Sequence, residues 1–401
     1  MADAPKLRVM FVDDEPAVLR MLRMGLRAMS QEWEVAYLER GDAALAMMEE
    51  KPFDVVVTDM RMGSVSGAGL INELLGRFPQ TVRLVVSGYA DEELVMKCLA
   101  ATHQYFAKPP DLERLKATLR RIACLGARLS QAEVRTAVTR MSRLPSAPAA
   151  QERLIEALES PSCSIGQIGE VVASDPSLAA QVLKLVNSAF FGFAREVSEV
   201  AEAVQLLGVG TLRSLALTFQ LFAKFDSATC SACALESIWT HSRRTAALAR
   251  RIALAESADR GIVEQAFTAG LLHDIGKLIL AADSPTQYAQ VLSLAHRERG
   301  GMAKAELLTW KTTSADVGAY LLGLWGLPAP LVDTAAYHHA PSDSADQTFT
   351  PLTAVHVASL LARESGVPKP EAVAATVDTE YLQRLGLVDR LPDWVAAAAA
   401  F

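Results

Sequence analysis

The feature that most constrains the fold is a regular alternation, over about the first 125 residues, of short apolar runs with helical stretches. The runs LRVMFVDDE, WEVAYLE, FDVVVTDM, TVRLVVSGY and HQYFAKPP predict five strands, and the stretches that follow them predict five helices, the first opened by Pro16. Strands that alternate with helices form a parallel sheet covered on both faces. Ligands of such sheets bind at the carboxyl ends of the strands. The sequence therefore predicts an α/β domain with a site along one edge of its sheet.

Polar residues stand at four of the predicted strand ends. Asp13 and Asp14 end the first strand, Asp59 ends the third, Ser87 the fourth and Lys108 the fifth. Each alone is an ordinary polar residue, but these ends share one edge of a parallel sheet, so the side chains should converge. Carboxylates suit Mg²⁺, and a lysine and a hydroxyl beside them suit phosphoryl transfer. The set predicts a magnesium-dependent phosphoryl-transfer site.

Residues 1–125 resemble the receiver domain of two-component response regulators, through FVDDE, VVVTDMRM, VVSGYA and YFAKPP. The resemblance implies a flavodoxin-like fold, phosphorylation by a sensor histidine kinase, and Mg²⁺ as cofactor. It implies that Asp59 is the phosphoacceptor and that Asp14 and Asp59 bind Mg²⁺ together with the backbone carbonyl of Arg61. Asp13 is expected to assist through water.

Three further positions follow from the same resemblance. Ser87 and Lys108 are expected to contact the phosphoryl oxygens, and Tyr105, three residues before the lysine, matches the aromatic switch position. One position departs from the family: Gly63 stands where receivers usually carry proline. This glycine loosens the loop but removes no catalytic group, so we expect Asp59 to accept phosphate.

From Asp111 the helical pattern continues to about Met141, and RLPSAPAA at 143–150 then breaks it. We expect one long helix that carries the signal to the output domain. Its apolar residues at 112, 115, 119 and 122 follow a heptad frame as far as Gly126. They could form a short seam in a homodimer or cover the receiver's own sheet, and both alternatives stay open. The expected domains are a receiver (1–125), a helical linker (126–143) and an all-helical domain (144–390, with a core from about 236).

The stretch LLHDIGKLIL at 271–280 places a His-Asp pair, His273 and Asp274, inside an apolar helical run. Two ionisable groups there are costly unless something satisfies them, and a divalent metal is one candidate. Four other histidines lie in helical segments between 240 and 357: His241, His338, His339 and His356. A lone histidine on an apolar helix is usually a core residue, but this array is typical of sites for one or two divalent metals.

Residues 144 to about 385 resemble the HDOD family, a helical and mostly regulatory branch of the HD superfamily. VVASDPSLAAQVLKLVNSAFFGF, VAEAVQLLGVGTLRSLAL, LLHDIGKLIL and VGAYLLGLWGLPAPLVDTAAYHHAP carry the resemblance. Catalytic HD proteins bind metal through His, His-Asp and Asp. His241 matches the first histidine, His273 and Asp274 match the pair, and His338 and His339 match a later doublet.

Two ligand positions of the HD pattern are not filled: Ser314 stands where a histidine is expected and Ser359 where the closing aspartate is expected. The Gly-Tyr-Pro stretch of cyclic-di-GMP hydrolases is also absent after the doublet. The remaining groups carry little charge to neutralise a dication. We therefore expect the cluster to satisfy itself by hydrogen bonds, with weak or absent metal and no cyclic-dinucleotide hydrolysis.

Two functions remain open. The first is a signalling response regulator, phosphorylated at Asp59, whose output domain acts on an unknown protein partner rather than by catalysis. The alternative is a metal-dependent phosphohydrolase of a nucleotide, gated by phosphorylation. A DNA-binding role is not expected, because no DNA-reading module is recognisable and the arginines of HSRRTAALARR at 241–251 alternate with alanines as on a solvated helix face.

Composition limits the class of protein further. The net charge of −7 argues against a general nucleic-acid or membrane-surface binder, and no leader segment or apolar run of about 18 residues is found. We therefore expect a cytoplasmic protein whose five cysteines stay reduced. The spacing of CSAC at 230–233 is that of a zinc knuckle, but no second cysteine pair completes it.

Overall fold

The computed structural model divides into two compact units, and each is described by itself. The first comprises residues 1–143, 187–195 and 323–326, and the second comprises 144–186, 196–322 and 327–401. The residues described are 6–63, 65–88, 98, 101–129, 131–141, 144–160, 162–188, 191, 193, 195–218, 232–256, 259–297, 301–362 and 376–399. Most of the helix expected at 92–102 and the start of the CSAC stretch lie outside them.

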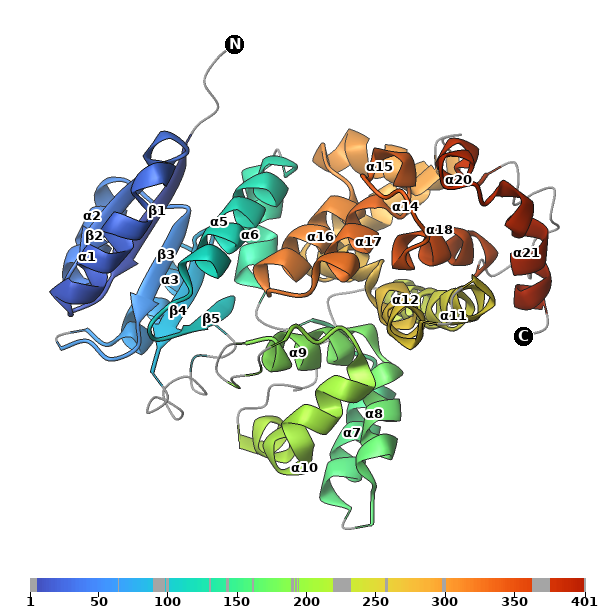
Figure 1. Cartoon of the computed structure of the whole chain (residues 1–401), viewed down its shortest axis with the longest axis horizontal. Coiled ribbons are helices and arrows are strands. Elements are labelled where there is room, and N and C mark those ends of the chain that lie inside the picture. The colour runs from blue at the N-terminus through green and yellow to red at the C-terminus, as the bar shows by residue number, and fades with distance from the viewer. Residues whose placement is uncertain are drawn as a thin grey trace. The chain divides into compact units, whose positions relative to one another are not determined.

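The first unit is built on a parallel sheet of five strands in the order β2-β1-β3-β4-β5 (Figure 1). Its strands are β1 (Leu7–Val12), β2 (Trp33–Leu38), β3 (Val55–Asp59), β4 (Val82–Ser87) and β5 (Gln104–Ala107). Every residue of β3 is buried, as expected for a central strand covered on both faces. The α/β prediction for this part of the chain is confirmed.

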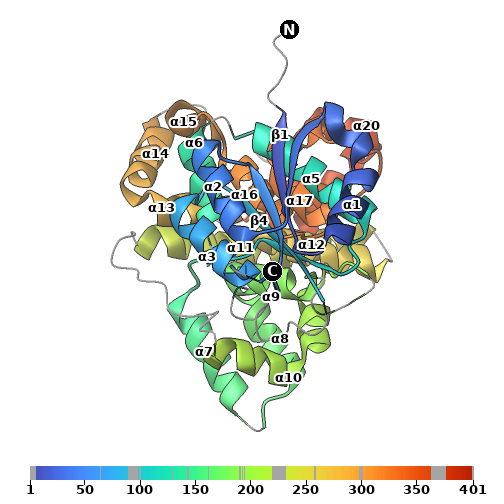
Figure 2. The same ribbon diagram turned by 90° about the vertical axis from the view of Figure 1, so that its left-hand side faces the viewer.

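Helices cover both faces of the sheet. They are α1 (Pro16–Gly25), α2 (Gly41–Glu50), α3 (Gly67–Arg77), α5 (Leu112–Ala127) and α6 (Ala132–Arg140), with a 3-10 turn η1 (Arg27–Gln31). Figure 2 shows α2 and α3 on one side of the strands and α1 and α5 on the other. Met10 and Val12 of β1 pack with Met48 of α2 and Leu70 of α3 in one buried cluster.

The prediction of one long helix from Asp111 to about Met141 is wrong. The chain forms α5 and α6 instead, and Gln131 between them is extended, with φ −96° and ψ 129°. Two local features weaken the helix at this point: Gly126, a poor helix former, and the 3-10-like turn in which Leu129 N–H bonds to the Gly126 carbonyl. The rest of the cause is tertiary, because α6 is bonded to the start of β4.

Three of the four residues of the heptad seam on α5 are buried, and the fourth, Leu112, is half-buried. Leu115, Leu119 and Ile122 are all at least 97% buried in the single chain, with exposed fractions of 0%, 0% and 3%. A seam that is covered within one chain is not available to a second subunit. The alternative in which these residues serve the chain's own core is the one that the burial supports.

The second unit is all-helical in the residues described (Figure 1). Its elements are α7 (Pro148–Glu159), α8 (Ile165–Ala173), α9 (Pro176–Val186), α10 (Val200–Thr218), α11 (Ala232–Glu256), α12 (Arg260–Leu272), α13 (Ile275–Asp283), α14 (Pro285–Arg297), α15 (Gly301–Trp310), α16 (Ser314–Leu324), α17 (Ala329–Tyr337), η5 (Pro341–Asp343), α18 (Pro351–Leu361), α20 (Thr379–Leu385), η6 (Val388–Arg390) and α21 (Leu391–Ala399). This confirms the expected fold class. Within the described ranges, no helix combines the length and the hydropathy needed to cross a membrane.

The stretch SDPSL has a structural role in this unit. Asp175 is 1% exposed, and its carboxylate accepts hydrogen bonds from the backbone N–H groups of Ala147, Ser177 and Leu178 at 2.8–2.9 Å. It therefore caps α9 and fixes the start of α7 at the same time. Burial raises the pKa of Asp175, and these three bonds oppose that rise.

Candidate functional site

The first candidate site lies at the carboxyl edge of the sheet. Asp13 follows β1 and Asp59 ends β3; both are buried, while Asp14 is exposed. One carboxylate oxygen from each of the three lies within 4.8 Å of the others, close enough to share one ion. Three oxygen donors with one side open to water fit Mg²⁺, which keeps several of its waters. The sequence predicted this convergence, and the structure places the three residues together.

Lys108 joins the carboxylates. Its Nζ atom lies 2.8 Å from Oδ2 of Asp59, 2.9 Å from Oδ2 of Asp13 and 3.1 Å from Oε1 of Glu15. Partial burial lowers the pKa of Lys108, but the two aspartates outweigh this and raise it above its usual value. Burial raises the pKa of Asp13, and Lys108 opposes that rise. The sequence reading missed Glu15, although it belongs to the quoted stretch FVDDE.

The other predicted residues of this site lie at or near the same edge. Ser87 ends β4, where it pairs with Ala107 of β5 in register. Tyr105 lies in β5 with 4% of its surface exposed, and burial raises the pKa of its phenol. Arg61 lies two residues beyond Asp59 with its side chain exposed. The roles expected for these three residues stay predictions.

A close backbone approach fixes the position of Asp59. A Cβ atom at Gly67 would lie 1.8 Å from the carbonyl oxygen of Asp59, so only glycine lets α3 begin this near β3. The N–H of Gly67 also donates to the Met60 carbonyl at 3.1 Å.

At Gly63, by contrast, an added Cβ would meet nothing within 4 Å. The departure from proline at that position therefore has no steric cause in the described structure.

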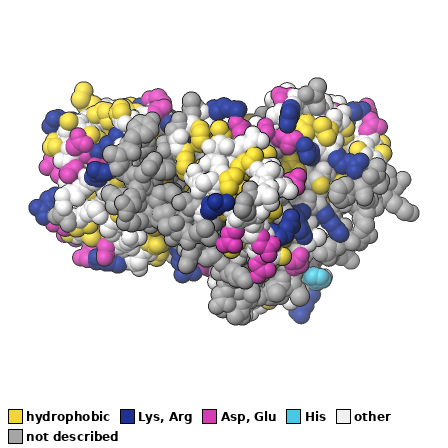
Figure 3. Space-filling model, turned by 90° about the horizontal axis from the view of Figure 1, so that it is seen from below, with side chains coloured by type: hydrophobic (Ala, Val, Ile, Leu, Met, Phe, Trp, Pro, Cys, Tyr) yellow, Lys and Arg dark blue, Asp and Glu magenta, His cyan; other side chains and the backbone are white. Residues whose placement is uncertain are grey.

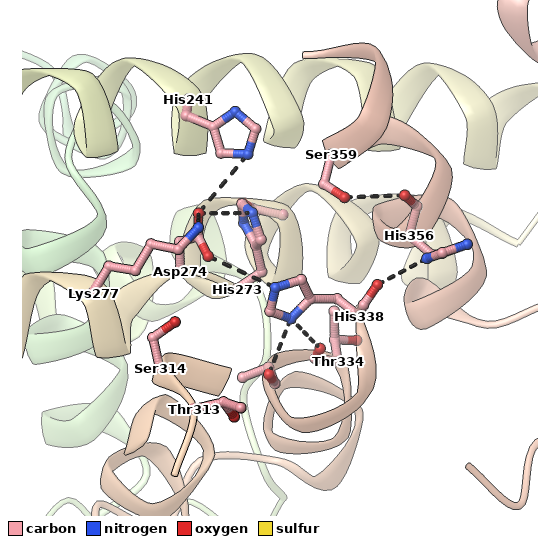
Figure 4. Close-up of polar contacts among 12 residues, drawn as sticks. His241, His273, Asp274, Lys277, Thr313, Ser314, Thr334, His338, His356 and Ser359 are labelled. Carbon is pink, nitrogen blue, oxygen red and sulfur yellow. Dashed lines mark hydrogen bonds and ion pairs between the residues drawn. The ribbon is translucent and has the colours of Figure 1, made fainter. Parts of the chain in front are cut away.

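The second candidate site is a histidine cluster in the second unit (Figure 4). His241 comes from the middle of α11, His273 and Asp274 from the junction of α12 and α13, and His338 and His339 from the end of α17. A close contact brings α11 and α12 together, since a Cβ at Gly270 would lie 2.8 Å from the Cα of Ala246. Residues 241 and 338, far apart in sequence, are thus placed on either side of the His-Asp pair.

The histidines point their Nε2 atoms at the carboxylate of Asp274. The distances to its oxygens are 3.4 Å from His273, 3.7 Å from His338 and 3.8 Å from His241. The Nδ1 atoms of His273 and His338 lie 2.7 Å from the Gly270 carbonyl and 3.0 Å from the Ala335 carbonyl. A carbonyl only accepts, so each Nδ1 carries the proton and each Nε2 offers a lone pair to the centre of the cluster.

The expectation that this cluster satisfies itself by hydrogen bonds is wrong. Nε2 of His273, Nε2 of His338 and Oδ1 of Asp274 are buried without a hydrogen-bond partner among the described residues. Separations of 3.4–3.8 Å are too long for hydrogen bonds. They resemble the roughly 3.3–3.6 Å between ligands that share a tetrahedral ion at about 2.0–2.2 Å. The described residues offer two ligand groups that share Asp274, one with His241 and His273 and one with His338 and His339, and the ligand atoms of each group lie within 4.8 Å of one another. Their donor types fit a divalent metal.

The electrostatic environment sets the protonation states that metal binding requires. Burial lowers the pKa of His273 to about 3 and that of His338 to about 4, so both rings are neutral near neutral pH. Burial alone would raise the pKa of Asp274, but His273 and Lys277 outweigh it and hold that pKa well below its usual value. Neutral imidazoles and an ionised carboxylate are the forms that bind metal.

The two serines at the unfilled ligand positions make their described hydrogen bonds to residues other than Asp274. Ser314 donates its backbone N–H to Oε2 of buried Glu306 at 2.8 Å, and the hydroxyl of Ser359 donates to the His356 carbonyl at 3.0 Å. His356 is not a fifth ligand, because its Nδ1 donates to the His338 carbonyl at 2.8 Å and its Nε2 accepts from Asp378 N–H. It holds the segment that carries His338 in place.

Lys277 is the functional residue of this site that the sequence reading passed over. Its Nζ lies 2.7 Å from Oδ2 of Asp274, and it lines a cavity of about 670 Å³ together with His241, His273, Asp274, His338 and His339. The other wall is largely apolar, with Tyr288, Leu292 and Met302. Its spacing from Asp274 could have indicated this role, because residues three apart on a helix lie on the same face.

Comparison with known proteins bears on both units. The profile of the response regulator receiver domain matches residues 9–120, and that of the HDOD domain matches residues 144–341. An uncharacterized protein of Treponema pallidum is 25% identical over 215 residues, which are 52% of this chain and 41% of that protein. The transcriptional regulatory protein ZraR of Salmonella typhimurium is 30% identical over 174 residues, 43% of this chain and 36% of ZraR. The chain thus spans less than half the length of these relatives.

A solved structure has a similar fold over part of this chain. The MmoQ response regulator from Methylococcus capsulatus aligns with a TM-score of 0.50 and 24% identity, over 63% of this chain and 98% of its own. At that identity the likeness shows the fold alone.

Proposed function

We propose that this chain, which belongs to the response regulators that join a receiver domain to an HDOD domain, is switched by phosphorylation of Asp59 and acts on another protein through its HDOD domain. A receiver domain takes its phosphoryl group from a phosphodonor such as a histidine kinase. In this proposal Asp59 is the acceptor, and Asp13, Asp14 and Asp59, with the backbone carbonyl of Arg61, hold the Mg²⁺.

The contact between Lys108 and Asp59 carries this proposal. An ammonium that already lies 2.8 Å from the acceptor carboxylate is placed to neutralise the oxygens of a transferred phosphoryl group. When bound, Mg²⁺ would supply the remaining positive charge. Ser87, at the end of the neighbouring strand, is placed to donate its hydroxyl to the same group.

The experiment is labelling of the full chain by a small phosphodonor, such as acetyl phosphate, with and without Mg²⁺. We expect intact mass to rise by one phosphate in the parent and in Asp54→Asn, a control at a carboxylate at the opposite end of β3, and to stay unchanged in Asp59→Asn. Equal labelling of Asp59→Asn, or no labelling of the parent, would contradict the assignment.

For the output, we propose protein–protein interaction rather than catalysis. The positions of Ser314 and Ser359 leave the HD ligand pattern two groups short, which weakens any hydrolytic site. A DNA-binding output finds no support on the face drawn in Figure 3, where basic and acidic side chains of the described residues are interspersed. Affinity capture from cell extract with phosphorylated parent and with Asp59→Ala tests the proposal: a protein must be retained by only one of the two.

The geometry of the histidine cluster favours a second candidate, a metal-dependent phosphohydrolase. The observation behind it is the set of buried Nε2 and Oδ1 atoms without hydrogen-bond partners in the described structure. His241, His273, Asp274 and His338 would hold the ion, which would supply positive charge and a more acidic bound water. Of this candidate we propose the bound metal, which the unpartnered ligand atoms support, and not the turnover, which the ligands missing at Ser314 and Ser359 weaken.

Elemental analysis with a thermal-shift measurement separates these possibilities. We expect about one divalent ion per chain and a melting temperature that rises with added Mn²⁺ or Zn²⁺, both lost in His338→Gln and retained in the exposed control His296→Gln. Absence of metal and of any shift in the parent would exclude the site. Product formed from a nucleotide, and lost in His273→Ala, would instead support the hydrolase.

A further inference from the structure

The strands β4 and β5 carry functional residues at one end and a second polar group at the other. At their carboxyl ends lie Ser87 on β4 and Lys108 just after β5. At their amino ends lie Arg83, the second residue of β4, and His103, immediately before β5. The same two adjacent strands therefore run from the phosphorylation site to a pair of buried cationic or polar side chains.

Arg83 is a buried arginine that is bonded entirely to main-chain oxygens. Only 2% of its surface is exposed. Its guanidinium donates to the carbonyls of Ala101 at 2.6 Å, Thr81 at 2.8 Å and Thr139 at 2.6 Å. No carboxylate among the described residues pairs with it. Burial lowers its pKa to about 10, which still leaves it charged at neutral pH. A buried charge of this kind is costly unless its hydrogen bonds are kept.

His103 binds the same carbonyl. Its Nδ1 accepts from the backbone N–H of Arg83 at 3.0 Å, so its Nε2 carries the proton and donates to the Thr139 carbonyl at 3.0 Å. One carbonyl oxygen thus receives two side-chain donors, one from β4 and one from the residue before β5. These two hydrogen bonds connect β4, the residue before β5 and α6 at the carbonyl oxygen of Thr139.

Thr139 lies one residue before the end of α6. The last carbonyls of a helix lack intrahelical partners and carry negative partial charge, so a guanidinium is a favourable partner there. The Thr139 hydroxyl is bonded to the unit as well, since it donates to the Pro79 carbonyl at 2.7 Å. Thr139 and Val138 are both fully buried. The end of α6 is therefore packed into the first unit and held there by hydrogen bonds.

We infer that Arg83 and His103 form the joint through which the receiver holds α6, and that phosphorylation at Asp59 reaches the output domain by loosening or tightening this joint. Both residues act as positioning residues, because neither touches the reacting atoms. The inference rests on the proposed function, since it supplies the regulation of that site. It replaces transmission along a continuous helix, which the break between α5 and α6 excludes.

The coupling is physically short. Ser87 is four residues from Arg83 along one strand, about 13 Å at the rise of a strand. A strand in a close-packed sheet moves with its neighbours, so a shift at the phosphoryl-contacting end is carried to the far end. Coupling of this kind typically changes an equilibrium by about 5- to 150-fold, which is measurable in hydrogen exchange.

The experiment measures amide hydrogen exchange of α6 residues 134–140 in the full chain, with and without acetyl phosphate and Mg²⁺, with intact mass recorded in parallel. The variants are Arg83→Lys and His103→Phe, and the control is Arg77→Lys on the exposed face of α3. We expect exchange in α6 to change severalfold on phosphorylation of the parent and the control. In both variants we expect basal exchange to rise roughly ten- to a hundredfold, because buried bonds to a charged donor or a shared carbonyl are lost.

The possible outcomes test the joint and the phosphorylation of Asp59 independently. If basal exchange of α6 in Arg83→Lys and His103→Phe equals that of the parent, the joint is excluded. If Asp59 is labelled but α6 exchange in the parent does not respond, the coupling is excluded. If Asp59 is not labelled, the proposed function fails and the coupling with it, while the basal exchange still decides the joint. Should Arg83→Lys not fold, His103→Phe decides, since it leaves the guanidinium bonds in place.

Discussion

Lys108 bridges Asp13 and Asp59, with its Nζ atom 2.9 Å from one carboxylate and 2.8 Å from the other. The three residues come from the ends of three different strands, and the ammonium links them across the edge of the sheet. The ammonium of Lys108 thus lies beside the same carboxylates that would bind Mg²⁺. We expect removal of the Lys108 ammonium to separate metal binding from the response to phosphorylation.

Lys108→Ala should keep Mg²⁺ binding and lose the response to phosphorylation. Without the ammonium, its repulsion of a second cation is removed and the carboxylates attract Mg²⁺ more strongly, so we expect Mg²⁺ affinity to be unchanged or about two- to tenfold tighter. The control is Lys51→Ala, whose exposed ammonium pairs with Glu34. Calorimetry measures the affinity, and limited proteolysis with and without phosphodonor measures the response. A full response in Lys108→Ala would contradict the role given to this lysine.

Gly67→Ala should destabilise the receiver and slow labelling of Asp59. The added Cβ has to move away from the Asp59 carbonyl, and overpacking of this kind costs about 1–3 kcal/mol. Gly76, in the same helix, is exposed, and a Cβ there meets nothing within 4 Å. We expect Gly76→Ala to be neutral or to stabilise by up to about 1 kcal/mol. Urea unfolding of the two variants checks the contrast, and equal effects would refute the close approach.

Asp175→Ala should cost far more stability than a comparable change at an exposed cap. Three backbone N–H groups lose their acceptor, so we expect the free energy of unfolding to fall by about 3 kcal/mol or more. Asp259 is the exposed cap of α12, and its carboxylate accepts from the Gly261 N–H at 2.8 Å. Asp259→Ala should cost about 1 kcal/mol. Thermal unfolding of both variants decides whether the SDPSL stretch is structural.

The metal-free second unit should lose stability as pH falls from about 6.5 to about 4. Folded His273 and His338 have pKa values of about 3 and 4, whereas unfolded histidine takes up its proton near pH 6.5. The unfolded state therefore binds more protons throughout this window. The stability is fully present above it and is lost at up to about 1.4 kcal/mol per pH unit for each histidine.

Urea unfolding at pH 7, 6 and 5, followed by tryptophan fluorescence in the presence of a chelator, measures this loss. We expect His338→Phe to have a shallower pH dependence by about one proton, and the exposed variant His296→Phe to keep the parent's dependence. A parent protein whose stability is flat between pH 5 and pH 7 would show that these imidazoles are not buried in the neutral form.

Much of the receiver site could be predicted from local pattern. The alternation of strands and helices fixes a parallel sheet, and polar residues at strand ends then have to meet at one edge, whatever the details of packing. Asp13, Asp14, Asp59 and Lys108 followed from that reasoning. Glu15 did not, because a carboxylate just outside the strand end is indistinguishable in sequence from any exposed residue near a helix start.

What the sequence by itself determined is the fold class of both units and the residue types gathered at each site, because these depend on periodicity and spacing within short segments. The identity of both domains came from their resemblance to known families. Tertiary structure decided where the helix after Asp111 ends, because its continuation packs on Arg83 rather than extending the helix. It also decided that the imidazoles face Asp274 without hydrogen bonds between them. Contacts between residues as distant as His241 and His338 depend on how whole helices pack, and no local pattern encodes that distance.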